Sequence, residues 1–274
     1  MANKSVFYSQ DVRGGPSVDA MSANEKDAVR DSAPPDPSTE DLDRLRRDYL
    51  SNVSHQFRTP LTLIRGYGEY LLGTDGGDPA TIQAAARVIL DSTDRVIDLV
   101  DTLIDVGRLE QVAAQDTLSD DSVDLAQLAR SAVRDANTRA EKKHIQIELE
   151  VPAVPSWVLG DGALLLQMLR KLLDNAIKYS SASARVVVRC RSDGVWHILE
   201  VEDEGIGMAA EHLPKVFDKF YMVEDGLARR GSGAGVGLYL VREIARLHGG
   251  MVEVSSEPDR GSVFTVKLPP EVEA

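Results

Sequence analysis

Two long stretches of the chain carry hydrophobic residues at steps that are mostly three or four. The first begins near Asp41, and its apolar positions are Leu42, Leu45, Tyr49, Val53, Phe57, Leu61, Ile64 and Leu71. After a break rich in Gly and Asp at 73–79, the second carries Ile82, Ala85, Ile89, Val96, Val100, Leu103 and Val106. One apolar stripe on each stretch predicts two antiparallel helices joined by a turn, which is a helical hairpin.

A hairpin with a single apolar stripe on each helix cannot shield both stripes from water. Two copies can do so if their helices pack together as a four-helix bundle. The pattern therefore predicts a homodimer that forms through the hairpin.

Beyond the hairpin the pattern changes to a mixture of helical and strand-like segments. Helices are expected at 125–141, 163–179 and 237–247, and strands at 145–151, 184–190, 196–202, 251–255 and 262–268. Such a mixture predicts a sheet covered by helices, an α/β sandwich. We therefore divide the chain into an arm (1–39), a hairpin domain (40–113), a linker (114–122), an α/β domain (123–270) and a tail (271–274). The arm is rich in Ser, Asp, Ala, Gly and Pro, and we expect it to be disordered.

Composition narrows the classes of function. The net charge of −13 argues against nucleic acid as a partner, because such proteins present Lys and Arg to phosphates. The single cysteine, Cys190, excludes an intrachain disulfide and a cysteine-based metal site, which favours a cytoplasmic location. No apolar run approaches the roughly 20 residues of a membrane-spanning helix, so no membrane segment is expected in this chain.

The candidate chemistry begins at the octet 54–61, Ser-His-Gln-Phe-Arg-Thr-Pro-Leu. His55 would lie in the middle of the first helix beside its apolar stripe, with Thr59 one turn further on. Pro60 removes one helical hydrogen-bond donor. Taken alone, the octet also fits a surface histidine followed by a tolerated kink.

The predicted helix at 163–179 places polar side chains on one face. Lys171, Asn175 and Lys178 or Tyr179 share that face. The Asn175 carbonyl oxygen suits a Mg²⁺ ion that bridges phosphates, and Lys178 supplies a positive charge for phosphate. An ordinary amphipathic helix with a solvated face is the alternative.

Two glycine-containing segments follow. In 203–207, Asp-Glu-Gly-Ile-Gly, the Asp203 carboxylate can accept a hydrogen bond from an exocyclic amine such as adenine N6. In 231–238 a glycine-rich loop leads into a helix, where backbone N–H groups and the helix dipole favour phosphate. Each segment alone is also compatible with a common turn or a hinge.

In this order, the segments resemble the motifs of the histidine kinase family over roughly 41–269. Residues 54–61 resemble its phosphoacceptor box, 167–179 its asparagine box, 203–207 and 233–238 its two glycine boxes, and 217–221 its phenylalanine box. The resemblance implies a dimeric HisKA-type hairpin followed by an α/β sandwich of the GHKL (Bergerat) ATPase/kinase superfamily, which includes gyrase-type and Hsp90-type ATPases.

The resemblance also implies a function and a set of site residues. The expected function is that of a two-component sensor histidine kinase, which uses ATP and Mg²⁺ to phosphorylate His55 and passes the phosphoryl group to an aspartate of a response regulator receiver domain. Phosphatase activity toward that regulator is a further expectation. The candidate catalytic residues are His55, Gln56 and Thr59, and Asn175 is the candidate Mg²⁺ ligand. The candidate nucleotide-binding residues are Lys171, Asn175, Lys178, Tyr179, Asp203, Gly205, Gly207, Arg229, Arg230, Gly233, Gly235, Gly237 and Leu238.

Three residues depart from the family's pattern. Gln56 stands where the family typically has Glu or Asp, and an amide cannot take up the proton of the attacking imidazole. Lys171 stands where a second Asn is common, and Met222 where an Arg is common, so that Arg229 or Arg230 would supply the charge. Two alternatives stay open: a weakened module that acts mainly as a phosphatase or scaffold, and a non-kinase ATPase of the same superfamily.

Overall fold

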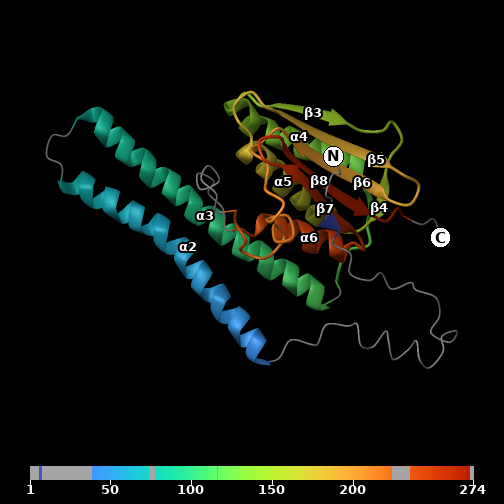
Figure 1. The fold of residues 1–274 in the computed structure, drawn as a ribbon, viewed down its shortest axis with the longest axis horizontal. Helices are drawn as coiled ribbons and strands as arrows, with labels where there is room; N and C mark the ends of the chain where they lie inside the picture. Colours follow the sequence, from blue (N-terminus) through green and yellow to red (C-terminus); the bar gives the residue numbers. More distant parts are fainter. Residues whose placement is uncertain (1–5, 8–38, 74–77, 116, 224–234, 272–274) are drawn as a thin grey trace.

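The computed structural model describes residues 6–7, 39–73, 78–115, 117–223 and 235–271. A long hairpin of two helices, α2 (Thr39–Gly73) and α3 (Pro79–Gln115), lies beside an α/β domain (Figure 1). The predicted hairpin is therefore present. Helix α3 continues two residues into the expected linker, and the next strand, β2, begins at Ser122.

Inside the hairpin, α3 buries Ala85, Ser92 and Leu99. These residues are spaced by seven, so they share one face of the helix. Towards its C-terminal end, α3 instead buries Val106 and Leu109, which belong to the same apolar cluster as the core of the α/β domain. One helix thus packs against α2 along one part of its length and against the α/β domain along another (Figure 1).

The α/β domain has one main sheet with the strand order β1-β7-β8-β6-β5-β3. Only the β3–β5 pair is parallel, and the other neighbours are antiparallel. The strands of this sheet are β1 (Val6–Phe7), β3 (Gln146–Glu150), β5 (Arg185–Ser192), β6 (His197–Asp203), β7 (Met251–Glu257) and β8 (Gly261–Leu268). The helices of the domain are α4 (Leu125–Lys142), α5 (Gly162–Tyr179) and α6 (Gly237–Leu247).

Helix α5 supplies the centre of the core. Its apolar residues recur at steps of three and four, and Leu165, Met168, Leu169 and Leu172 are fully buried. Asp161 caps the start of this helix by accepting hydrogen bonds from the N–H groups of Ala163 (2.8 Å) and Leu164 (3.1 Å). The buried apolar face fixes the rotation of α5, so that its polar face is directed away from the core.

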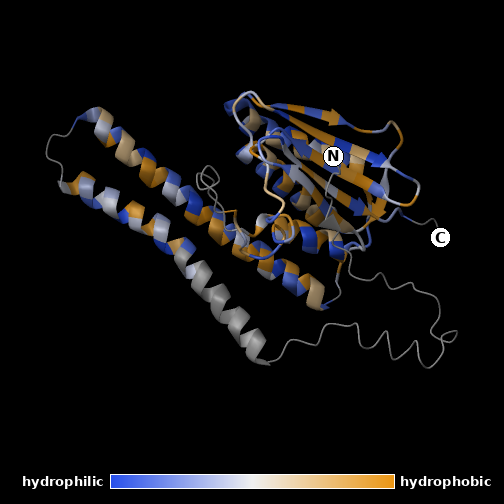
Figure 2. Cartoon of the chain, viewed as in Figure 1, coloured by the Kyte–Doolittle hydropathy of each residue, from blue (hydrophilic) through white to orange (hydrophobic). Residues whose placement is uncertain are grey.

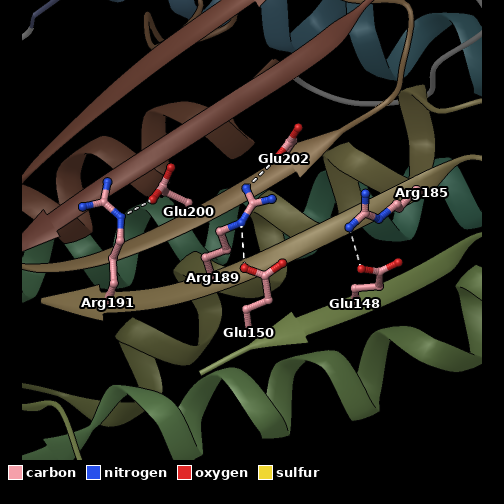
Figure 3. A network of polar contacts seen from close by, with 7 residues as sticks. All are labelled: Glu148, Glu150, Arg185, Arg189, Arg191, Glu200 and Glu202. Carbon is pink, nitrogen blue, oxygen red and sulfur yellow. Dashed lines mark hydrogen bonds and ion pairs between the residues drawn. The ribbon is translucent and has the colours of Figure 1, made fainter. Parts of the chain in front are cut away.

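The sheet face opposite the helices carries charges. Val186, Val188 and Cys190 of β5 point into the core, so the alternate residues Arg185, Arg189 and Arg191 lie on the other face. Figure 3 shows their ion pairs with glutamates of the neighbouring strands. The distances are Arg185–Glu148 2.6 Å, Arg189–Glu150 3.0 Å, Arg189–Glu202 2.5 Å and Arg191–Glu200 2.6 Å. Figure 2 shows hydrophobic and hydrophilic residues interspersed along the strands.

The predicted α/β architecture is confirmed, with two additions. Strands β2 (Ser122–Asp124) and β4 (Trp157–Leu159) form a small antiparallel sheet. The sequence did not predict it, because three residues are too few to show a periodic pattern. The expectation that the whole arm is disordered is wrong for Val6–Phe7, which pairs with β7. Strand β7 would otherwise form the edge of the sheet, and its free backbone groups can pair with Val6–Phe7. The sequence of the arm alone does not reveal this pairing. No helix in the described part of the chain has the combination of length and apolarity needed to span a lipid bilayer.

Candidate functional site

A cavity of about 420 Å³ opens between α5, the end of β6, the start of β8, the start of α6, and α3. The structure brings nine of the candidate binding residues to its wall. These are Lys171, Asn175, Lys178, Tyr179, Asp203, Gly207, Gly235, Gly237 and Leu238.

Helix α5 contributes the polar side of the cavity. Lys171, Asn175 and Lys178 are half-buried there, while Leu172, Leu173 and Ala176 of the same helix lie in the core. The Lys178 ammonium lies 4.9 Å from the centre of the Tyr179 ring, within the range of a cation–π contact. Two amines and an amide thus line one wall, as the helical spacing predicts.

Asp203 stands at the end of β6 and is only 6 % exposed. Its Oδ1 accepts a hydrogen bond of 2.9 Å from the Gly205 N–H. Burial raises the pKa of this carboxyl from 3.8 to about 6, although hydrogen bonds from the backbone of Gly205 and Ser262 act in the opposite direction. The buried carboxylate offers acceptor capacity to a ligand in the cavity.

Gly205 does not line the cavity, but it allows close packing behind Asp203. A Cβ at this position would lie 2.5 Å from Asp203 Oδ1 and 2.9 Å from the Tyr179 carbonyl oxygen. Any side chain would therefore push the carboxylate away from its position, which explains why glycine is required here.

The start of α6 forms the opposite wall. Gly235 has a φ of +66°, and a Cβ there would lie 2.7 Å from the Phe220 carbonyl carbon. Val236 occupies the N-cap of α6 without a side-chain cap hydrogen bond, so the N-cap residue leaves the first N–H groups of the helix available to a ligand. With Gly237 and Leu238 on the cavity wall, these groups favour an anionic ligand.

Apolar side chains complete the cavity, and none of them was among the candidate binding residues, although Ile206 and Tyr221 lie within the motifs. Tyr221 is held by a hydrogen bond of 2.8 Å between its hydroxyl group and His212 Nδ1. The other apolar or aromatic residues on the wall include Ile206, Met208, Val216, Met222, Val223 and Phe264. Walls of this kind suit a flat ring next to the Asp203 acceptor.

Asp98, Asp101 and Thr102 of α3 also line the cavity, which the motifs did not predict. Burial raises the pKa of the Asp98 carboxyl, the charge of Lys171 lowers it, and the neighbouring acidic residues raise it. The sequence did contain a signal, because Asp94, Asp98, Asp101 and Asp105 recur at helical steps.

The candidate phosphoacceptor segment lies on α2, and of its residues whose side chains the structure describes (54 and 56–61), none lines the cavity. His55 is helical, Gln56 is partly buried, and Thr59 is exposed. Pro60 is buried within the helix, and the Thr62 hydroxyl donates a hydrogen bond of 2.8 Å to the Arg58 carbonyl oxygen. Arg229, Arg230 and Gly233 lie outside the described residues.

The donor set fits a nucleotide with a bound cation. Asp203 offers an acceptor for an amine, and the lysines of α5 and the start of α6 offer positive charge for phosphates. Among the residues that the structure describes, no group of three or more His, Cys, Asp or Glu could enclose a metal ion. A cation held through the Asn175 carbonyl oxygen would keep most of its waters, which is the coordination that Mg²⁺ prefers.

Comparisons with known families match two regions. Residues 45–112 match the His Kinase A (phospho-acceptor) domain, and residues 160–272 match the family described as Histidine kinase-, DNA gyrase B-, and HSP90-like ATPase. The first match contains His55, and the second contains α5, β6 and α6.

Individual proteins are also similar to the chain. Sensor protein SrrB of Staphylococcus aureus strain MRSA252 is 30 % identical over 228 residues, which is 83 % of this chain but 39 % of that protein. The chain therefore spans about two fifths of the length of such curated relatives. A structure of full-length ShkA in complex with AMPPNP has a TM-score of 0.58 and 27 % identity, covering 83 % of this chain and 46 % of that one. The Acinetobacter baumannii histidine kinase AdeS shares the fold, with a TM-score of 0.59 and 24 % identity over 80 % of this chain and 98 % of that one.

Proposed function

Because the chain belongs to the sensor histidine kinases, we propose that it transfers the γ-phosphoryl group of ATP to His55. The observation that carries the proposal is the pairing of two matches in one chain: a phosphoacceptor domain with His55 on α2, and an ATPase domain whose cavity holds Asp203 and Asn175. The similar ShkA structure contains AMPPNP, an ATP analogue, which supports ATP as the phosphoryl donor.

In the proposed complex the adenine ring lies against the apolar walls. Its exocyclic amine donates a hydrogen bond to the Asp203 carboxylate. Lys171, Lys178 and the N–H groups at the start of α6 hold the phosphates, and Asn175 holds Mg²⁺. The ion supplies positive charge that offsets the charge of the phosphate oxygens. The shape of the proposed site depends on Tyr179, on Leu238 and on the glycines at 205, 207, 233, 235 and 237. Arg229 or Arg230 adds positive charge.

The proposed reaction has two transfers. A ring nitrogen of neutral His55 attacks the γ-phosphorus, the bond to the bridging β–γ oxygen breaks, and ADP leaves with that oxygen. The other ring nitrogen loses its proton to solvent, since the Gln56 amide can orient the ring but cannot accept the proton. The carboxylate of a receiver-domain aspartate then attacks the phosphorus, the P–N bond breaks, and His55 leaves as a neutral imidazole after taking up a proton from solvent.

We further propose that the hairpin forms the homodimer. Several large apolar side chains on α2 and α3 are exposed in the single chain, namely Leu61, Tyr67, Tyr70, Leu72, Ile82, Leu90, Ile97, Val100 and Ile104. A second hairpin can cover them, as in a four-helix bundle. The same hairpin would present His55 to the receiver domain of a response regulator.

The proposal is tested with ATP labelled at the γ-phosphate. We expect label to enter the protein, to be stable to alkali and lost in acid, and to be absent from His55→Gln. Release of free phosphate without labelled protein would instead indicate a non-kinase ATPase. If neither reaction occurs while nucleotide still binds, the protein is a weakened module that acts as a phosphatase or scaffold.

A phosphatase reaction would depend on Thr59. This exposed hydroxyl lies one turn from His55 and could position a water molecule against a phosphorylated aspartate. Thr59→Ala should therefore slow the dephosphorylation of the regulator more than the phosphorylation of His55.

A further inference from the structure

Lys171 contacts helix α3 of the hairpin and also lines the cavity of the α/β domain. Its ammonium group lies 3.2 Å from a carboxylate oxygen of Asp105 on α3, and both side chains are about one quarter exposed, at 25 % and 26 %. Lys171 also lines the cavity beside Asn175. The charge that would hold a nucleotide phosphate is therefore paired with the hairpin in this structure.

This ion pair is part of a larger contact. Val106 and Leu109 of α3 are each 3 % exposed and belong to the apolar cluster of the α/β domain. Glu110 of the same helix lies 3.0 Å from the Lys219 ammonium. Helix α3 also contacts α6, whose first turn lines the cavity (Figure 1).

The same helix brings negative charge to the cavity. Asp98 and Asp101 lie on its wall, and Asp105 follows one turn after Asp101. A polyphosphate would be repelled by these carboxylates and attracted by Lys171. A nucleotide phosphate and Asp105 would therefore compete for a single ammonium group.

We propose that Lys171 changes its partner when nucleotide binds, from Asp105 to a phosphate, so that binding weakens the contact between α3 and the α/β domain. The proposal rests on the proposed function, because it requires phosphates in the cavity. Linkage makes the effect reciprocal: a change that removes Asp105 as a competitor must tighten nucleotide binding.

The test is calorimetric titration of the full chain with Mg²⁺-AMPPNP. Asp105→Asn keeps the size of the side chain and removes its charge, and we expect binding to tighten roughly two- to fivefold, the range for a partly exposed ion pair. Glu110→Gln is the matched control, because it breaks the other ion pair of the contact away from the cavity wall. Its affinity should change clearly less than that of Asp105→Asn, because Glu110 does not compete with a phosphate for Lys171.

A double-mutant cycle separates exchange at Lys171 from simple repulsion. In a Lys171→Gln background, Asp105→Asn should no longer tighten binding if the two residues act through their ion pair. A gain that persists in that background would mean that Asp105 only repels phosphate, and the exchange would be wrong. Equal gains for Asp105→Asn and Glu110→Gln would mean that any loosening of α3 suffices, which would also overturn it.

Failure of this inference can be told apart from failure of the proposed function. If the wild type binds AMPPNP but Asp105→Asn has the same affinity, only the partner exchange is wrong. If the wild type binds no adenine nucleotide, both proposals fall. Circular dichroism of each variant shows whether an altered affinity comes from altered folding.

Discussion

Asp203 carries a carboxyl group that the fold buries at the end of β6, yet the proposed role requires it to be ionised. Burial raises its pKa to about 6, so the carboxylate is charged at neutral pH and protonated in mild acid. Its folded pKa lies above the unfolded value, so ionisation of Asp203 opposes folding. The protonated carboxyl group therefore favours the folded state relative to the ionised one. This contribution to the free energy of unfolding is fully present below pH 3.8 and is lost as the pH rises through about 6. Strong acceptor capacity thus carries a cost in stability.

We predict that adenine nucleotide binding weakens as the pH falls from 7.5 to 5.5, because the protonated carboxyl group is a poorer acceptor for the adenine amine. Titrations with Mg²⁺-AMPPNP across this range would measure the effect. Asp203→Asn is the control for titration of the phosphates themselves, and its affinity should be lower and less dependent on pH. Parallel pH profiles of the two proteins would contradict the role given to Asp203.

Gln56 lies next to His55, but its amide cannot accept the proton that the imidazole ring loses in the proposed reaction. If removal of the imidazole proton limits the rate, Gln56→Glu should accelerate phosphorylation of His55 by roughly 10²–10⁴-fold, the range of general-base catalysis. Single-turnover rates with labelled ATP separate this step from ADP release. His55→Gln must stay inactive with either residue at position 56, and an unchanged or slower rate in Gln56→Glu would show that proton removal is not limiting.

Among the elements, α6 has a glycine with a left-handed backbone conformation just before its start and another just after its end. Gly235 and Gly249 flank this helix on its two sides, with φ angles of +66° and +68°. An added Cβ would collide with backbone atoms of Phe220 and Tyr221 at Gly235, but it would meet only the Pro269 ring, at 3.6 Å, at Gly249. The two glycines therefore share a conformation and differ in available space.

We predict that Gly249→Ala lowers the free energy of unfolding by about 1 kcal/mol, from the left-handed conformation alone. Gly235→Ala should cost about 1–3 kcal/mol more, because the surrounding backbone must shift. Urea denaturation of both variants measures the difference. Only Gly235→Ala should also weaken nucleotide binding, and equal effects of the two substitutions would contradict this account of the loop.

The elements also show where the sequence is informative. The polar face of α5 and the turn after Asp203 could be predicted because each depends on residues close together in the chain. The contact of Lys171 with Asp105 could not, because the two residues are far apart in sequence and meet only when α3 packs against the α/β domain. Asp98 and Asp101 were missed for the same reason. Strands β2 and β4 are too short to produce a periodic pattern.

For the molecule as a whole, the exposed apolar side chains of the hairpin predict its assembly state. Ile97 and Ile104 are 52 % and 63 % exposed and lie two turns apart on α3. Replacing both with Asp should convert the proposed dimer to a monomer, because the carboxylates would be buried without partners. Light scattering would measure the mass. Val195→Asp, at a 66 % exposed site on the α/β domain, is the control and should leave the mass unchanged.

The two edges of the main sheet differ in a way that bears on aggregation. Strand β3 ends one side, and its Glu148 and Glu150 place charges along the outer face, which discourages another chain from adding a strand. On the opposite side, the described residues that cover β7 are Val6 and Phe7, which pair with Val254 and Glu253. Removing the first eight residues should therefore leave β7 as an open template, and the shortened protein should form insoluble, thioflavin-binding material sooner on heating than the full chain. Equal onset in both proteins would mean that the short strand gives β7 no protection.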